Sequence, residues 1–217
     1  MARRRKEEAQ ETREKILDAA IEVFHKSGVS RPSLSEIAKL AGVTRGAVYG
    51  HFENKADLFS ALTDRIDLPD ESLCQANLDN VCDPVGEIRK RWTALYRGVA
   101  TNQQWQLIFE VLLLRCELVP ESGGIYQRCA EGHREGTNRL RKLVEAAVRL
   151  GQLPENLDIQ AAVPILHSSL FGLLHDWLMN PADYDLATVG ERQVDAIIEM
   201  LRTSPALRTG TLSSLGA

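Results

Sequence analysis

The chain has 217 residues, of which 44% are hydrophobic and 26% charged, and its net charge is −4. This composition is that of a globular protein and excludes collagen-like and low-complexity architectures. The opening residues Met1 to Lys6 lack the apolar core of a signal peptide, and no apolar run approaches the roughly 20 residues of a membrane span. We therefore expect a cytoplasmic protein with no membrane partner.

Charge is distributed unevenly along the chain. Residues 1–60 contain 11 Lys and Arg against 9 Asp and Glu, a net charge of +2, whereas the remaining residues contain 15 against 21, a net charge of −6. A mildly basic first quarter beside an acidic remainder is consistent with a polyanion-binding head on a body that has another task.

Almost every segment has helical periodicity, so we predict an all-α fold of about nine helices. The first helix is expected from Glu8 to Ser27, where Gly28 suits a C-cap. Two short helices follow: Ser33 and Glu36 open the first through a capping box, and Thr44 caps the second. Longer helices are expected over residues 54–66, 84–101, 104–118, 125–150, 158–179 and 187–202.

The segment from Ser33 to Phe52 has the pattern of a helix-turn-helix. Two short helices that cross steeply need a small residue where they approach, which Ala38 supplies. They also need a residue that tolerates positive φ four positions later, which Gly42 supplies. Apolar side chains spaced to hold the pair on a supporting helix are Leu34, Ile37, Val43, Val48 and Phe52. The pattern predicts that the second short helix enters a major groove of double-stranded DNA.

The second short helix carries the residues expected to meet DNA. Arg45, near its N-terminus, is placed to read a base edge, most often that of guanine. The other predicted DNA-contacting residues, chiefly at phosphates, are Ser33, Ser35, Thr44, Gly46, Tyr49, His51 and Lys55. A solvated polar face is the alternative for these side chains. We assign residues 1–53 to an N-terminal three-helix helix-turn-helix DNA-binding domain and residues 54–217 to a C-terminal helical bundle.

Three signatures in residues 10–60 resemble the TetR family of one-component repressors. They are T-R-x-x-I-L-x-A-A from Thr12, G-V-T-R-G-A-V-Y-x-H-F from Gly42 and N-K-x-x-L-F from Asn54. The two ends of the chain further resemble the AcrR/TtgR-like branch, whose members repress multidrug efflux operons. One position departs from the pattern: Gly50 stands where many members have Trp or Tyr, which is expected to loosen the recognition helix.

The resemblance implies that the C-terminal bundle binds a hydrophobic, drug-like small-molecule inducer. Apolar walls with a few polar groups suit such a pocket, although they also describe an ordinary core. The candidate ligand-binding residues are Trp92, Tyr96, Phe109, Leu112, Leu113, His133, Leu140, His167, Leu170, Phe171 and Leu174. A ligand that binds better when the two DNA-binding heads are mis-spaced must weaken DNA binding. The helix over residues 54–66 is predicted to transmit ligand binding to the DNA-binding head.

The resemblance also implies a homodimer in which the last two helices of each copy form a four-helix bundle. Both helices have an apolar stripe that needs a partner. The candidate dimer residues are Leu166, Leu173, Trp177, Val194, Ile197, Ile198 and Leu201. Packing of both stripes within one chain is the alternative.

The remaining signals are weak. The four cysteines, Cys74, Cys82, Cys116 and Cys129, have no metal-ligand spacing and are expected to be reduced thiols, with a redox switch as the alternative. We expect no metal and no cofactor. The sequence has no GxSxG, HExxH, GxGxxG or Walker pattern, so an enzyme is not expected. An activator, or a regulator of a metabolic operon, stays open.

Overall fold

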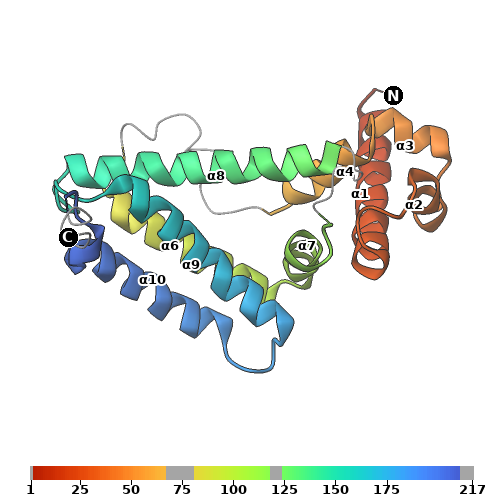
Figure 1. Cartoon of the computed structure of the whole chain (residues 1–217). Helices are drawn as coiled ribbons and strands as arrows, with labels where there is room; N and C mark the ends of the chain where they lie inside the picture. Colours follow the sequence, from red (N-terminus) through yellow and green to blue (C-terminus); the bar gives the residue numbers. More distant parts are fainter. Residues whose placement is uncertain (1, 67–80, 118–123, 211–217) are drawn as a thin grey trace. The chain divides into compact units, whose positions relative to one another are not determined.

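The structure is a computed structural model that describes residues 2–66, 81–117 and 124–210, with side chains from Lys6 onward. Within these ranges the regular elements are helical, which confirms the all-α prediction (Figure 1). The helices are α1 (Ala2–Ser27), α2 (Leu34–Leu40), α3 (Arg45–His51), α4 (Lys55–Thr63), α6 (Pro84–Thr101), α7 (Gln103–Leu114), α8 (Gly124–Arg149), α9 (Ile159–Met179), α10 (Leu186–Thr203) and the 3-10 turn η3 (Pro205–Leu207).

Most predicted helix boundaries agree with the structure within two residues. The largest difference lies in α1, which begins at Ala2 rather than at Glu8 because residues 2–7 contain only good helix formers. The helix expected to end at Leu118 ends at Leu114, and residue 118 lies outside the described ranges. None of the described helices combines the length and the apolar character needed to cross a bilayer.

The chain divides into two compact units. The first comprises residues 1–67 and 103–131, and the second comprises residues 68–102 and 132–217. Helix α8 contributes its first turns to one unit and the rest of its length to the other. The division of the chain into functional domains after residue 53 stays a prediction.

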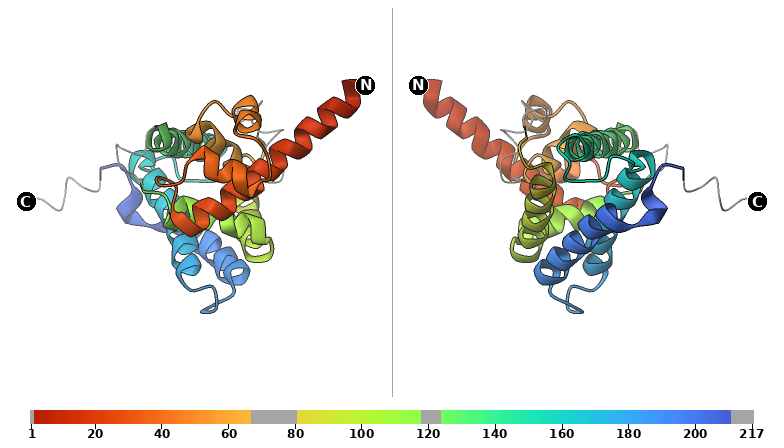
Figure 2. Two further views of the ribbon diagram at one scale, coloured as in Figure 1. Left: turned by 90° about the vertical axis from the view of Figure 1, so that its right-hand side faces the viewer. Right: turned by 90° about the vertical axis from the view of Figure 1, so that its left-hand side faces the viewer.

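In the first unit, α2, α3, α4 and α7 all contact α1. Its core includes Ile16, Phe24, Val48, Phe52, Phe59 and Ile108, all at most 2% exposed. Arg65, just after α4, bonds to the side chain of Asp18 at 2.6 Å and to the carbonyl of Glu14 at 3.0 Å, which fixes the end of α4 against α1. The N-terminal turns of α1 extend beyond the other helices of this unit (Figure 2).

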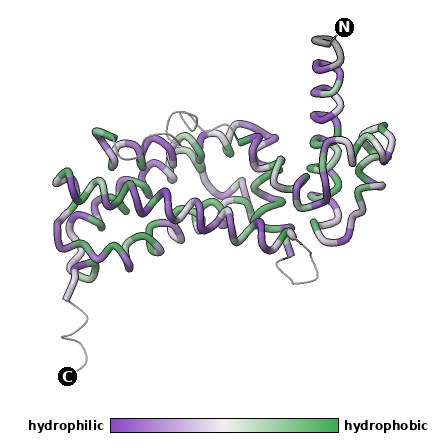
Figure 3. Tube along the Cα trace, turned by 90° about the horizontal axis from the view of Figure 1, so that it is seen from above, coloured by the Kyte–Doolittle hydropathy of each residue, from purple (hydrophilic) through white to green (hydrophobic). Residues whose placement is uncertain are grey.

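In the second unit, α10 packs against both α6 and α9. The tube coloured by hydropathy shows apolar and polar positions alternating along these helices, as amphipathic helices require (Figure 3). Helices α6 and α10 approach closely at Gly190, where a Cβ would lie 2.2 Å from the ring of Tyr96. The Tyr96 hydroxyl lies 2.8 Å from both the Leu170 carbonyl and the Gln193 amide oxygen, and burial raises the pKa of Tyr96.

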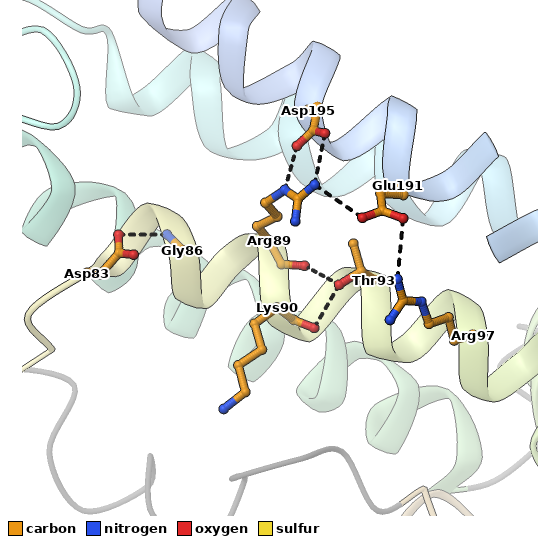
Figure 4. A network of polar contacts seen from close by, with 8 residues as sticks. All are labelled: Asp83, Gly86, Arg89, Lys90, Thr93, Arg97, Glu191 and Asp195. Atoms are coloured by element: carbon orange, nitrogen blue, oxygen red, sulfur yellow. Dashed lines mark hydrogen bonds and ion pairs between the residues drawn. The ribbon is translucent and has the colours of Figure 1, made fainter. Parts of the chain in front are cut away.

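A network of exposed ion pairs joins α6 to α10 (Figure 4). The Arg89 guanidinium donates to Asp195 at 2.6 and 3.0 Å and to Glu191 at 3.2 Å, and Arg97 donates to Glu191 at 3.3 Å. The hydrogen bond from Arg89 lowers the pKa of Asp195. Because water screens exposed pairs, each contributes only about 0–1 kcal/mol, so this network sets the register of the two helices more than it stabilises the fold.

Candidate nucleic-acid interface

Helix α2 begins at a complete capping box, as predicted. The Ser33 hydroxyl accepts a hydrogen bond from the Glu36 amide at 3.3 Å, and the Glu36 carboxylate accepts one from the Ser33 amide at 2.6 Å. Hydrogen bonds from Ser33 lower the pKa of Glu36. The two groups satisfy amides that the first turn of a helix leaves without partners. Ser33 and Ser35 are both exposed at this end of α2.

The turn between α2 and α3 depends on Gly42. This residue has a φ of +68°, and the next amide, that of Val43, donates to the Ala38 carbonyl at 3.0 Å. A residue with a side chain is disfavoured at such a φ. Ala38 is 3% exposed where the two helices approach each other. Both roles that the sequence assigned to these two residues are therefore present in the structure.

Helix α3 is short and has one buried side chain. Thr44 caps it by accepting a hydrogen bond from the Ala47 amide at 3.1 Å, and Val48 is fully buried in the core of the first unit. Thr44, Arg45, Gly46 and Tyr49 are exposed, and His51 is half-buried. The helix is thus held by one face and presents the predicted DNA-contacting residues on the other.

Arg45 and Tyr49 form a pair on the exposed face of α3. The guanidinium carbon lies 5.3 Å from the centroid of the tyrosine ring, and the guanidinium donates to the tyrosine hydroxyl at 3.3 Å. Tyr49 is 47% exposed, which is unusual for so large a side chain. Stacking on an aromatic face restricts the motion of the arginine, so the planar donor group is oriented before it meets a ligand.

Lys55 has a role that the sequence did not reveal. Its ammonium donates to the carbonyls of Ser30 at 2.6 Å and Pro32 at 3.1 Å, so it anchors the loop between α1 and α2 to the start of α4. Burial lowers the pKa of Lys55, and Glu36 partly offsets this. A phosphate contact stays a prediction, and any phosphate would share this ammonium with the two carbonyls.

A second contact that holds α3 in place was also not predictable from the local sequence pattern. The guanidinium carbon of Arg13, on α1, lies 5.4 Å from the centroid of the Phe52 ring, which ends α3. These residues are far apart in sequence, so no helical or turn spacing connects them. The contact fixes the end of α3 against the supporting helix.

Five of the predicted ligand-binding side chains form a continuous row of rings in the second unit. The centroid distances are 6.1 Å for Trp92–Tyr96, 5.1 Å for Trp92–Phe171, 4.6 Å for Phe171–His167 and 4.7 Å for His167–His133. We call these five residues the aromatic row. Burial and the neighbouring His133 lower the pKa of His167, which favours its neutral imidazole.

The other predicted ligand-binding residues are divided between the two units. Leu140, Leu170 and Leu174 are buried in the second unit. Phe109, Leu112 and Leu113 belong to the first unit, where Phe109 is buried and Leu112 packs against the core. Whether they line one cavity stays a prediction.

The predicted dimer residues occupy the inside of the second unit. Leu166, Trp177, Val194, Ile197, Ile198 and Leu201 are each at most 6% exposed within a single chain, and Leu173 is half-buried. Within one chain these side chains form the core between helices, and their assignment to a dimer interface stays a prediction. On α9, the residues left exposed to a partner copy include Ile165, Ser168, Gly172, His175 and Met179.

Two family models match separate parts of this chain. Residues 16–62 match the family described as "Bacterial regulatory proteins, tetR family", and residues 83–203 match the "MAATS-type transcriptional repressor, C-terminal region". The HTH-type transcriptional regulator TtgR of Pseudomonas putida is 39% identical over 209 residues, which cover 96% of this chain and 100% of TtgR. The regulator AcrR of Shigella flexneri is 34% identical over 96% of this chain and 97% of its own.

The solved structures agree. A complex of SmeT with triclosan superposes with a TM-score of 0.78 at 30% identity, over 93% of this chain and 96% of SmeT. SmeT is described as the repressor of the Stenotrophomonas maltophilia multidrug efflux pump SmeDEF. Together with the helix-turn-helix geometry of α2 and α3, these similarities show that the chain belongs to the TetR family of bacterial transcriptional regulators.

Proposed function

We propose that this protein represses a multidrug efflux operon by binding operator DNA as a homodimer, and that a hydrophobic, drug-like molecule releases it. The relatives that resemble it over nearly their whole length are HTH-type regulators, and SmeT is a repressor of an efflux pump. As a DNA-binding regulator it would act in the cytoplasm.

The observation that carries the proposal is the exposed face of α3. This helix is held through the buried Val48 and the Gly42 turn, so its position is fixed by the core rather than by the ligand. Arg45 is stacked and oriented next to its N-terminus. A short helix with a fixed base and an oriented arginine at its free face suits a base edge in the major groove.

A mobility-shift titration with the DNA upstream of the gene, repeated at several salt concentrations, tests the proposal. Arg45→Ala should weaken operator binding by about 1–3 kcal/mol and relax the preference at one base pair, because a bidentate base contact is lost. Tyr49→Ala should weaken specific and non-specific DNA alike and should also free Arg45. Tyr49→Phe keeps the stacking and is the matched control. Unchanged binding by both alanine variants would refute the placement of the recognition helix.

For the inducer we propose the aromatic row as part of the binding site. Trp92, Phe171 and His167 are all half-buried, so each keeps some exposed surface that an apolar molecule could cover. Triclosan is a rational probe because SmeT binds it in a solved complex. We expect triclosan to quench the fluorescence of Trp92 and to weaken operator binding, and we expect Phe171→Ala to diminish both effects. If saturating triclosan and other apolar antimicrobials left operator affinity unchanged, ligand-driven release would be rejected.

We propose that α8, together with α4, transmits ligand binding to the DNA-binding helices. Arg128, on α8, donates to the Ser60 hydroxyl of α4 at 2.7 Å, and His133 of the aromatic row follows five residues later on the same helix. A ligand that moves His133 would therefore act on α4 through a continuous helix. Arg128→Ala should keep triclosan binding but reduce its effect on operator affinity.

A further inference from the structure

We infer that Cys116 and Cys129 form a redox-sensitive dithiol site, which a hydroperoxide converts into an intramolecular disulfide. The two Sγ atoms lie 3.7 Å apart, although the residues are separated by 13 positions. Cys116 follows the end of α7, and Cys129 lies in the second turn of α8. A disulfide has an S–S distance of about 2.05 Å, so the sulfurs must approach by about 1.6 Å, a displacement within reach of side-chain rotation.

The surroundings of the pair distinguish the two thiols. Cys116 lies within hydrogen-bonding distance of Cys129, and the positive charge of the neighbouring residue, Arg128, acts on Cys129. The contact with Cys116, together with Arg128, lowers the pKa of Cys129, whereas the same contact and burial raise the pKa of Cys116. Because the thiolate is the reactive form and the cationic Arg128 directly precedes Cys129 in the chain, we assign Cys129 as the attacking sulfur and Cys116 as the resolving one.

A pocket gives small molecules access to Cys116. Its volume is about 310 Å³, and the charged residues that line it are Lys26, Arg31, Arg115 and Glu117. These four side chains are exposed on the first unit, and the three cations outnumber the one carboxylate, which favours a thiolate beside them. The volume exceeds what a small hydroperoxide needs.

The reaction balances with one hydroperoxide, ROOH. The Cys129 thiolate attacks the terminal peroxide oxygen, the O–O bond breaks, and ROH leaves after taking a proton, so that Cys129 becomes a sulfenic acid. The Cys116 sulfur then attacks the Cys129 sulfur, the S–O bond breaks, and the hydroxide leaves as water with the Cys116 proton. Two thiols are oxidised by two electrons and the peroxide is reduced. Thiol reductants in the cell reverse the reaction.

The disulfide changes the support of the DNA-binding helices. The Arg115 carbonyl accepts a hydrogen bond from the Val29 amide at 3.3 Å, within the loop that leads from α1 to α2. Arg128 beside Cys129 contacts Ser60 on α4. A disulfide would tie together the two segments that carry these attachments and restrain both, so oxidation should weaken operator binding; this consequence rests on the proposed function.

The test uses the full-length reduced protein and a few equivalents of cumene hydroperoxide. We expect the intact mass to fall by two hydrogens and peptide mapping to join Cys116 to Cys129. Cys82→Ser, which removes an exposed cysteine elsewhere, is the matched control and should behave like the parent. Cys116→Ser should instead accumulate a sulfenic acid on Cys129 that dimedone traps. Operator affinity should fall about tenfold on oxidation, within the usual range of coupling energies, and dithiothreitol should restore it.

The outcomes separate the two proposals. If Cys116 and Cys129 stay reduced while Cys82 reacts, or if dimedone labels Cys116 in preference to Cys129, the dithiol site is refuted. If the disulfide forms and operator affinity does not change, the redox coupling is refuted and the proposed repressor function stands. If the reduced protein does not bind operator DNA at all, the proposed function fails independently of the disulfide.

Discussion

At the scale of single residues, two glycines of the helix-turn-helix show that open space and backbone conformation are separate constraints. A Cβ at Gly42 or at Gly50 would meet no atom within 4 Å. Gly42, however, has a φ of +68°, whereas Gly50 lies inside the regular helix α3. From the resemblance to the TetR family we expected Gly50 to loosen this helix, and glycine does lower helix stability.

The two glycines therefore predict opposite effects of one substitution. Gly50→Ala should stabilise the protein by about 0.5–1 kcal/mol, because alanine loses less backbone entropy in a helix. Gly42→Ala should destabilise it by about 1–2 kcal/mol, because the left-handed conformation is strained for any side chain. Chemical denaturation of both variants measures the difference. Equal effects of the same sign would contradict this account of the turn.

His167 predicts how stability depends on pH. Burial and His133 lower the pKa of His167 below its ordinary value of 6.5, so between its folded and unfolded pKa values the unfolded chain binds more protons. The titration of His167 therefore costs no stability above about pH 6.5, and it lowers the free energy of unfolding as the pH falls from there through the folded pKa.

We expect the melting temperature of the parent protein to fall more steeply between pH 7.5 and 5 than that of His167→Gln. His175→Gln, on the exposed face of the same helix, is the control and should follow the parent. Parallel pH profiles for the parent and His167→Gln would show that His167 does not contribute this dependence.

At the scale of helices, the contact between α6 and α10 depends on the absence of a side chain at Gly190. The ring of Tyr96 occupies the space that a Cβ would need, and backbone atoms of α10 cannot withdraw without losing the neighbouring contacts. Tyr96 is itself held by hydrogen bonds at its hydroxyl, so the ring cannot rotate away freely.

Gly190→Ala should therefore destabilise the protein by about 1–3 kcal/mol through overpacking, even though alanine is the better helix former. Gly132→Ala, at an exposed site of α8 with no atom within 4 Å of the added Cβ, is the matched control and should be neutral or stabilising. Thermal unfolding of the two variants tests this pair. A stable Gly190→Ala variant would mean that α6 and α10 can separate at little cost.

At the scale of the whole molecule, the proposed homodimer needs a surface where two copies can meet. The apolar stripes named from the sequence are already buried, so the exposed stripe of α9 is the surface left for a partner on that helix. Ser168 and Gly172 are small and allow helices to approach closely, and Ile165 and Met179 flank them with apolar surface.

We expect Gly172→Arg to yield a monomer in size-exclusion chromatography with light scattering, because the charged side chain cannot be buried between two helices. Operator binding should weaken with it, since one monomer contacts only a half-site. Lys142→Glu, an exposed charge change on α8, is the control and should remain dimeric. A Gly172→Arg variant that is still dimeric would place the interface elsewhere.

The amino-acid sequence by itself determined the local features of this protein. The capping box of Ser33, the positive φ of Gly42 and the cap at Thr44 each depend on neighbours within a few positions, so residue type and spacing were sufficient to predict them. The helical class and most helix boundaries followed for the same reason. The family signatures are local patterns as well.

Only the tertiary structure decided which apolar face of α9 and α10 is buried, which carbonyls hold Lys55 and which two cysteines lie side by side. Helical periodicity marks an apolar stripe but does not say whether the same chain or another copy covers it. The contacts between Cys116 and Cys129, and between Arg65 and Asp18, join residues on different helices, and their distances depend on how those helices pack. That packing minimises the exposure of the whole core, a property that no short window of sequence contains.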